Sequence, residues 1–500
     1  MKNQKVIVFG VDGLIPELIY KFSSEGYLPN IKKMLANGSS SKLFPFISTW
    51  GDVNWVSFMT GQSPGISWRG QGQVTTNEDN LIGLTNSFGK KGALVHFPNS
   101  LSTEGTDHFN FAPFQGQAPF ELAPPKVFST NINKWPKKEK KESLGWPPTA
   151  SIAHHDKNNR SEITRDNGVY SFNIEISNGK NVTVNIEPVD HKNIRLLVNN
   201  NIREDVSVGN WSEWVRIPLG DNEEGIVRFN LAHYDLDNLE IDLIQSQFNR
   251  TTGLSNDLSL EEFLLDTCGP FISTWAIKAS PDERYYETGF EEAEYQAMWL
   301  AEAALTLLEK KQVDYFATVF RLNDETHHTS LAQYDPSSPF YSEEQSQRYE
   351  KNMRNSYIVL DKVIGELLNR KSDDTTVILA SDHGNVPNHY FCDIYLRLAE
   401  CNLCELDDNG LPILSRSKAY LKDDRGGLEV YINLEGREEH GIVSIDDYEL
   451  VQNEIFHAIT TWSHILNDNP VNVAALTLKK ARRFICRILG PRYGGCHFCL

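Results

Sequence analysis

Continuous apolar runs separated by amphipathic stretches predict an α/β fold in the first and last parts of the chain. The apolar runs are short and contain β-branched and aromatic residues, as is typical of strands buried in a parallel sheet; they cover residues 5–12, 313–320 and 375–380. Apolar positions at helical spacing predict helices at residues 14–37 (divided at Pro29), 54–61, 290–311 and 342–371. This alternation predicts a mostly parallel sheet sandwiched by helices.

The pattern changes to a period of two between about residues 120 and 275. A Pro-rich and Lys-rich stretch at residues 124–148 has the composition of a polar connector, and short alternating runs such as "YSFNIEI" and "VTVNIEP" follow it. We therefore expect an inserted β-rich domain at residues 121–275. The α/β domain would then be discontinuous, formed by residues 1–120 and 276–500.

Composition and charge exclude several classes of partner. The net charge of -19 argues against binding to nucleic-acid polymers or to an anionic membrane surface, since both require clustered cationic charge. The chain has no apolar stretch of about 20 residues and starts without the pattern of a signal peptide, so we expect no membrane-spanning helix. Seven cysteines, an odd count in a long chain, are typical of reduced thiols and predict a cytoplasmic protein.

Acidic residues follow three of the predicted strands: Asp12, Asp324 and Asp382. Because the carboxyl ends of parallel strands meet at one edge of a sheet, we expect these carboxylates to converge. His383 directly follows Asp382, and His328 lies one helical turn after Asp324. Carboxylates and imidazoles together suit Zn²⁺, Mn²⁺ or Fe. The alternatives are a capped turn at "SDHG" and a solvated helix start at "DETHH".

Several motifs resemble the alkaline phosphatase superfamily in its type I phosphodiesterase/nucleotide pyrophosphatase branch. They are "VIVFGVDG", "LPNIKKMLANG", "NWVSFMTGQSPG", "NDETHH", "VILASDHGNVP" and "GLEVYINLEGREEHGIV". The resemblance implies a phosphoester hydrolase with an alkaline-phosphatase-like fold, two divalent metal ions (Zn²⁺ or Mn²⁺) and a small phosphoester or phosphoglycan substrate. It implies one metal bound by Asp12, Asp382, His383 and the nucleophile, and a second bound by Asp324, His328 and one further histidine.

The nucleophile of this family is a Thr or Ser just before a helix, where the helix N-terminus favours phosphate. Alignment without gaps places Gly51 there, whereas a loop longer by two residues places Thr49 there, with Ser48 next to it. We therefore predict Thr49 as both nucleophile and metal ligand. The candidates for the third histidine are His440 and His389.

Three alternatives stay open. One is a weak or inactive relative whose inserted domain binds a glycan or a protein, because the nucleophile and third histidine are not clear and the end of the chain looks truncated. Another is a phosphomutase or phosphotransferase on the same scaffold. The pairs "CNLC" at 401–404 and "CHFC" at 496–499 could also bind a structural zinc ion.

Overall fold

The structure is a computed structural model, and it divides into two compact units. The larger unit comprises Met1–Phe44, Thr76–Lys137 and Asp156–Pro387, and the smaller one comprises Pro45–Thr75, Lys138–His155 and Asn388–Leu500. The residues that the structure describes are 4–43, 51–61, 80–98, 106–113, 118–135, 160–177, 179–220, 223–387, 393–421, 429–463, 474–477 and 496–499.

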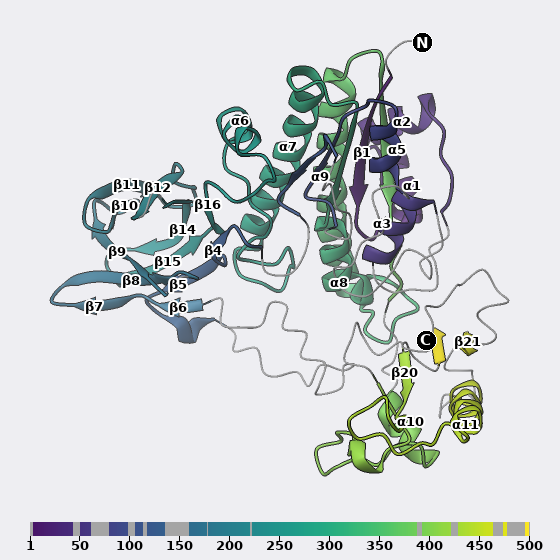
Figure 1. Ribbon diagram of the computed structural model, residues 1–500. Coiled ribbons are helices and arrows are strands. Elements are labelled where there is room, and N and C mark those ends of the chain that lie inside the picture. Colours follow the sequence, from purple (N-terminus) through teal and green to yellow (C-terminus); the bar gives the residue numbers. More distant parts are fainter. Residues whose placement is uncertain are drawn as a thin grey trace. The chain divides into compact units, whose positions relative to one another are not determined.

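A five-stranded parallel sheet forms the centre of the larger unit (Figure 1). Its strand order is β18 (Thr375–Ser381), β1 (Lys5–Val11), β17 (Tyr315–Phe320), β2 (Gly92–Val95) and β3 (Phe109–Phe111). All neighbouring strands are parallel. The continuous apolar sequences of β1 and β17 are explained by this central position, where both faces of a strand are buried. The protein is therefore a mixed α/β protein with a parallel sheet.

Helices cover one face of this sheet through a shared hydrophobic core. Ile7, Phe9, Val11, Phe316 and Phe320 alternate along β1 and β17 and contribute to that core. The helices that pack there are α1 (Pro16–Ser24), α2 (Pro29–Asn37), α6 (Leu258–Cys268), α7 (Tyr286–Lys310) and α9 (Glu343–Arg370). The long helices α7 and α9 run beside each other (Figure 1), and α5 (Leu81–Ser87) contacts β2. Prolines at the first position of α1 and α2 begin those helices, because proline needs no amide partner there.

The described strands between Glu121 and Arg250 form three further sheets around a second hydrophobic core. Their strand orders are β11-β10-β9-β8-β7, β12-β13-β16-β4 and β14-β15-β5-β6. The strands are β4 (Glu121–Ala123), β5 (Lys126–Ser129), β6 (Arg160–Glu162), β7 (Thr164–Asp166), β8 (Val169–Glu175), β9 (Asn181–Pro188), β10 (Asn193–Val198), β11 (Ile202–Ser207), β12 (Val215–Gly220), β13 (Glu223–Val227), β14 (Phe229–Asp235), β15 (Glu240–Gln245) and β16 (Phe248–Arg250).

The connector predicted at residues 124–148 was wrong in its first part, because Lys126–Ser129 forms strand β5. Val127 and Phe128 are buried there, and β5 pairs with β15 and β6. Two prolines before this segment and many lysines after it give the whole stretch the composition of a loop. That composition concealed a short apolar strand.

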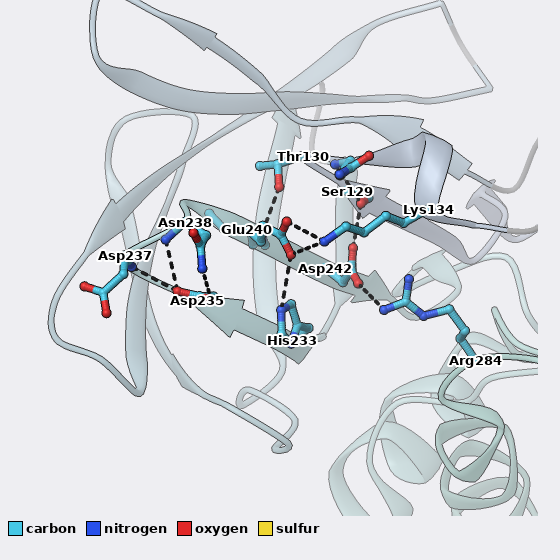
Figure 2. A network of polar contacts seen from close by, with 12 residues as sticks. Ser129, Thr130, Lys134, His233, Asp235, Asp237, Asn238, Glu240, Asp242 and Arg284 are labelled. Carbon is cyan, nitrogen blue, oxygen red and sulfur yellow. Dashed lines mark hydrogen bonds and ion pairs between the residues drawn. The ribbon is translucent and has the colours of Figure 1, made fainter.

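Polar side chains of this β-rich region are largely paired with one another (Figure 2). Lys134 Nζ donates to both carboxylate oxygens of Glu240, at 2.5 and 2.6 Å. The side chain of Asp242, on β15, lies 3.4 Å from Arg284, which precedes α7. Glu240 and Asp242 therefore have partners that the chain itself supplies.

The smaller unit contains a four-stranded antiparallel sheet in the order β19-β20-β22-β21. Its strands are β19 (Ala419–Leu421), β20 (Glu429–Ile432), β21 (Ala474–Thr477) and β22 (Cys496–Cys499), and its helices are α3 (Gly51–Thr60), α10 (Ile394–Glu400) and α11 (Tyr448–Thr460). Leu398, Ile432 and Ile455 belong to its core.

Candidate metal centre

The register of the parallel sheet brings the ends of three strands to one edge. Val11 at the end of β1 pairs with Phe320 on one side and with Ser381 on the other. Asp12, Arg321 and Asp382 are the next residues along these strands. Sequence-distant charged groups therefore meet at the carboxyl edge of the sheet, where ligand sites of open α/β sheets lie.

Asp12, Asp324 and His383 form a group that could hold a metal ion. One ligand atom from each residue can be chosen so that all three lie within 4.8 Å of one another. His383 Nε2 lies 3.2 Å from Asp12 Oδ1. The other ring nitrogen, Nδ1, lies 2.8 Å from the carbonyl oxygen of Gly384 and donates to it when protonated. This hydrogen bond leaves Nε2 as the ligand atom, in the way that outer partners orient metal-binding histidines.

Asp382 contributes a buried carboxylate with one oxygen that lacks a hydrogen-bond donor among the described residues. Its Oδ1 accepts hydrogen bonds from the backbone amides of Gly13 (3.2 Å) and His383 (2.9 Å). Its Oδ2 has no hydrogen-bond partner among the described residues and lies 3.7 Å from His383 Nε2. A buried carboxylate oxygen without a donor is costly, and a cation would remove that cost. Gly384 does not adopt the left-handed conformation that a simple capped turn would use.

Helix α8 (Leu322–Tyr334) carries the second part of the site. Asp324 and His328 lie one turn apart, with Asp324 Oδ2 3.2 Å from His328 Nε2. The side chain of His328 is 66% exposed, so it is open to a ligand.

The buried side of α8 is mostly polar, although Leu322 and Leu331 join the hydrophobic core. Asn323 and Thr326 donate to Ser356 Oγ of α9, and Asn352 of α9 donates to Ser330 Oγ. Hydrogen bonds are directional, so this interface fixes the rotation of α8 more strictly than apolar packing would. The rotation of the helix determines where Asp324 and His328 lie.

The charges of the group strongly perturb one another. Burial and the charge of Asp324 raise the pKa of Asp12. Burial and the charge of Asp12 raise the pKa of Asp382 to about 7. Burial alone would lower the pKa of His383, but the carboxylates of Asp12 and Asp382 outweigh it and raise that pKa to about 10. Protons thus offset the mutual repulsion of the carboxylates, and a divalent cation would replace those protons.

Asp324 differs from the other two carboxylates. Burial would raise its pKa, but hydrogen bonds from His328 and Asn385 outweigh burial and lower the pKa to about 2. This carboxylate is therefore held in its charged form, the form that binds a cation.

Thr49, Ser48 and His389 are outside the described residues. His440 is exposed in the smaller unit. Cys404 is buried, with its sulfur 3.4 Å from Ser417 Oγ.

Three residues near the group were not predicted from the sequence. Asn385 and His327 contact it or its neighbours, and Arg321 follows β17 at the same edge. Asn385 stands in "SDHGN" and His327 in "DETHH", both singled out as motifs, but spacing alone does not distinguish His327 from His328. Arg321 could have been found as the residue directly after a buried strand.

Fold and site together define a mixed α/β protein with an acidic and histidine-containing candidate metal centre. A family model described as type I phosphodiesterase / nucleotide pyrophosphatase matches residues 6–68 and 246–483. These ranges cover more than half of the chain, so the chain belongs to the type I phosphodiesterase/nucleotide pyrophosphatase family of the alkaline phosphatase superfamily. The family indicated by the motifs is therefore confirmed. Comparisons with curated proteins and with solved structures gave no match.

Among the described residues, no helix is both long enough and apolar enough to cross a membrane.

Proposed function

We propose that this chain is a metal-dependent phosphodiesterase or nucleotide pyrophosphatase that uses Thr49 as its nucleophile and two divalent ions, Zn²⁺ or Mn²⁺. The observation that carries the proposal is the convergence of Asp12, Asp324 and His383 beside Oδ2 of Asp382, which has no hydrogen-bond donor among the described residues, in a chain of this family. The set of carboxylate oxygens and imidazole nitrogens fits both ions.

The residues divide into two proposed ligand sets. Asp12, Asp382, His383 and Thr49 would hold one ion, and Asp324 and His328 would hold the other with a further histidine. Ions at these positions would lower the pKa of a hydroxyl nucleophile and offset the negative charge of phosphoryl oxygens. The proposal includes an alkaline-phosphatase-like sheet, a catalytic domain of residues 1–120 and 276–500, and an inserted domain of residues 121–275.

The chain's own residues would act as follows. Thr49 Oγ forms a bond to phosphorus as the bond to the leaving group breaks in line with it, and the leaving oxygen keeps the electron pair. Water then cleaves the threonine ester and restores the hydroxyl group. Arg321, whose Nη2 donates to Ser273 O at 3.3 Å, adds positive charge at the sheet edge. Such local charge attracts a phosphoester despite the net charge of -19.

The family indicates a small phosphoester substrate, and we propose a phosphoglycan as one form of it. We also propose that the protein acts in the cytoplasm. The test compares hydrolysis of bis-p-nitrophenyl phosphate and p-nitrophenyl phosphate, with Zn²⁺ or Mn²⁺ added, by the wild type, Thr49→Ala and Ser48→Ala. We expect diester turnover that Thr49→Ala abolishes and Ser48→Ala retains. Loss in Ser48→Ala alone would move the nucleophile to Ser48. No turnover by the wild type with either metal would contradict the proposed activity.

A further inference from the structure

The side chain of Asn385 connects the three segments that carry the proposed ligands. It stands two residues after His383, and its Nδ2 lies 3.2 Å from Gly13 O, 3.0 Å from Asp324 Oδ1 and 3.1 Å from His327 Nδ1. Gly13 follows β1, and the other two acceptors are on α8. A single amide group therefore joins the loop after β18 to the end of β1 and to α8.

The orientation of this amide is set by His327, which is buried. His327 Nε2 lies 3.2 Å from the hydroxyl oxygen of Tyr357, which also accepts a hydrogen bond from the amide of Ile15 at 3.1 Å. The amide nitrogen of Asn385 can only donate, so Nδ1 of His327, 3.1 Å away, is the acceptor and the ring proton lies on Nε2. With that proton on Nε2, the ring donates to Tyr357, and Nδ1 accepts from Asn385.

This chain of hydrogen bonds determines which oxygen of Asp324 faces His328, the other proposed ligand on α8. Oδ1 accepts from Asn385, whereas Oδ2 lies 3.2 Å from the exposed His328. The geometry leaves little freedom, because a Cβ atom at Gly13 would lie 2.6 Å from Asn385 Nδ2 and 2.7 Å from Asp324 Oδ1.

We propose that Asn385 is a positioning residue that presents Asp324 Oδ2 to a divalent metal ion, and that His327 fixes the orientation of Asn385. Neither side chain contacts the reacting atoms in this assignment. Both ring nitrogens of His327 are occupied by hydrogen bonds, so His327 itself is not a ligand. The inference rests on the metal sites of the proposed function but not on the reaction.

The experiment measures the affinity of the metal-depleted protein for Zn²⁺ and for Mn²⁺ by competition with a chromophoric chelator. We expect Asn385→Ala to lower the affinity for one of the two bound ions by about 10–100-fold, the usual effect of removing a hydrogen-bond partner of a metal ligand. We also expect kcat to fall and to recover in excess metal, which a purely structural defect would not show.

Asn433→Ala is the matched control. Asn433 is buried in the smaller unit, and its Nδ2 also reaches three acceptors, the carbonyl oxygens of Leu414 (2.8 Å), Ser417 (2.9 Å) and His440 (2.8 Å). We expect this variant to lose stability while it keeps the metal affinity of the wild type. An equal loss of affinity in both variants would overturn the inference, as would an Asn385→Ala affinity within threefold of the wild type.

If Asn385→Ala does not fold, a second pair of variants tests the positioning role of Asn385 through its acceptor, His327. His327→Leu removes the acceptor for Asn385, whereas His327→Asn keeps an acceptor close to the position of Nδ1. We expect His327→Leu to lower the affinity for the metal ion and His327→Asn to retain most of it. Equal affinities in the two variants would overturn the inference.

The two proposals fail separately. A wild type that binds metal without hydrolysing esters, with weaker binding in Asn385→Ala, contradicts the activity and supports the positioning role. An active wild type whose affinity Asn385→Ala does not change contradicts the positioning role alone.

Discussion

Burying a charged carboxylate costs free energy, and two buried aspartates in different regions of the larger unit compensate this cost in different ways. Asp242, in the β-rich region, is 6% exposed, and Asp382, at the edge of the parallel sheet, is 7% exposed. Asp242 accepts hydrogen bonds from Ser129 Oγ (2.5 Å) and Tyr285 Oη (2.7 Å), and Arg284 lies 3.4 Å away. Asp382 has two hydrogen-bond donors, both backbone amides on one oxygen, and its other oxygen lies 3.7 Å from His383 Nε2.

The difference shows how a structural carboxylate can be told from a ligand. A buried carboxylate whose two oxygens both have donors is complete within the chain. A buried carboxylate with an open oxygen, next to Asp12, needs a cation from outside or a proton. Burial is the same in both cases, so the distinction comes from the number and identity of the partners.

The largest expected effect follows from removing the charge in each region. Asp382→Asn should lower turnover by about 1000-fold, since charge stabilisation by a bound metal contributes several kcal/mol to the transition state. The same substitution should lower the amount of Zn²⁺ bound per chain. Metal analysis after gel filtration and diester hydrolysis measure both effects.

Asp242→Asn is the matched control for this comparison. It should keep metal content and turnover while lowering the free energy of unfolding by about 1–3 kcal/mol, because Arg284 and Tyr285 lose a charged partner. If Asp382→Asn bound metal like the wild type, the open oxygen would not be a ligand atom and the comparison would fail.

The sequence predicted three of the five strands of the parallel sheet, β1, β17 and β18, and missed the short strands β2 and β3. The central strands β1 and β17 are buried on both faces, whereas β18 lies at the edge of the sheet and is partly exposed. A strand such as β1 then consists of continuous apolar residues, and the acidic residue that ends it stands out. This is why Asp12, Asp324 and Asp382 could be chosen without a structure.

The positioning side chains could not be chosen in this way. Asn385 acts through one amide that meets acceptors from residues 13, 324 and 327, and these lie together only after the sheet has formed. The strand at Lys126–Ser129 was hidden for a different reason, because its neighbours have loop composition. Contacts between distant segments and short strands in polar surroundings both depend on tertiary structure.

A substitution at Gly13 tests how closely the side chains pack at the carboxyl edge of the sheet, where the proposed metal ligands lie. Gly13 has a φ of +69°, and its missing Cβ leaves space for Asn385 and Asp324. Gly13→Ala should therefore weaken metal binding by about 10-fold or more and destabilise the protein by about 1–3 kcal/mol. Chelator competition and urea unfolding measure the two effects.

Gly26→Ala separates strain from contact. Gly26 also has a left-handed backbone (φ +88°), but nothing lies within 4 Å of a Cβ placed there. We expect this variant to lose about 1 kcal/mol of stability from backbone strain and to keep the metal affinity of the wild type. Weaker metal binding in Gly26→Ala would mean that general destabilisation, rather than the crowded edge, controls affinity.

Glu292 shows a third way of burying a carboxylate. It is fully buried on α7; Oε2 accepts from the amide of Ala276 at 3.2 Å, and Oε1 has no hydrogen-bond partner among the described residues. Burial raises its pKa to about 8, and Arg228 opposes the shift. At neutral pH this carboxyl group is therefore neutralised by a proton rather than by an ion-pair partner or a metal ion. The pKa in the folded protein lies above the unfolded value of about 4.5. The stability from this group is therefore complete below pH 4.5 and is lost as the pH rises from about 4.5 to about 8.

Glu292→Gln should remove this pH dependence, because an amide stays neutral and can still accept from Ala276. We expect the variant to be about as stable as the wild type near pH 5 and more stable by roughly 3–4 kcal/mol near pH 8. Urea unfolding between pH 5 and pH 9 measures the difference. Glu291→Gln, which changes the exposed neighbour that accepts from Trp211 Nε1, should keep the decline of the wild type. Parallel pH profiles for the wild type and Glu292→Gln would show that Glu292 is ionised in the folded protein, and that Arg228 acts as its ion-pair partner.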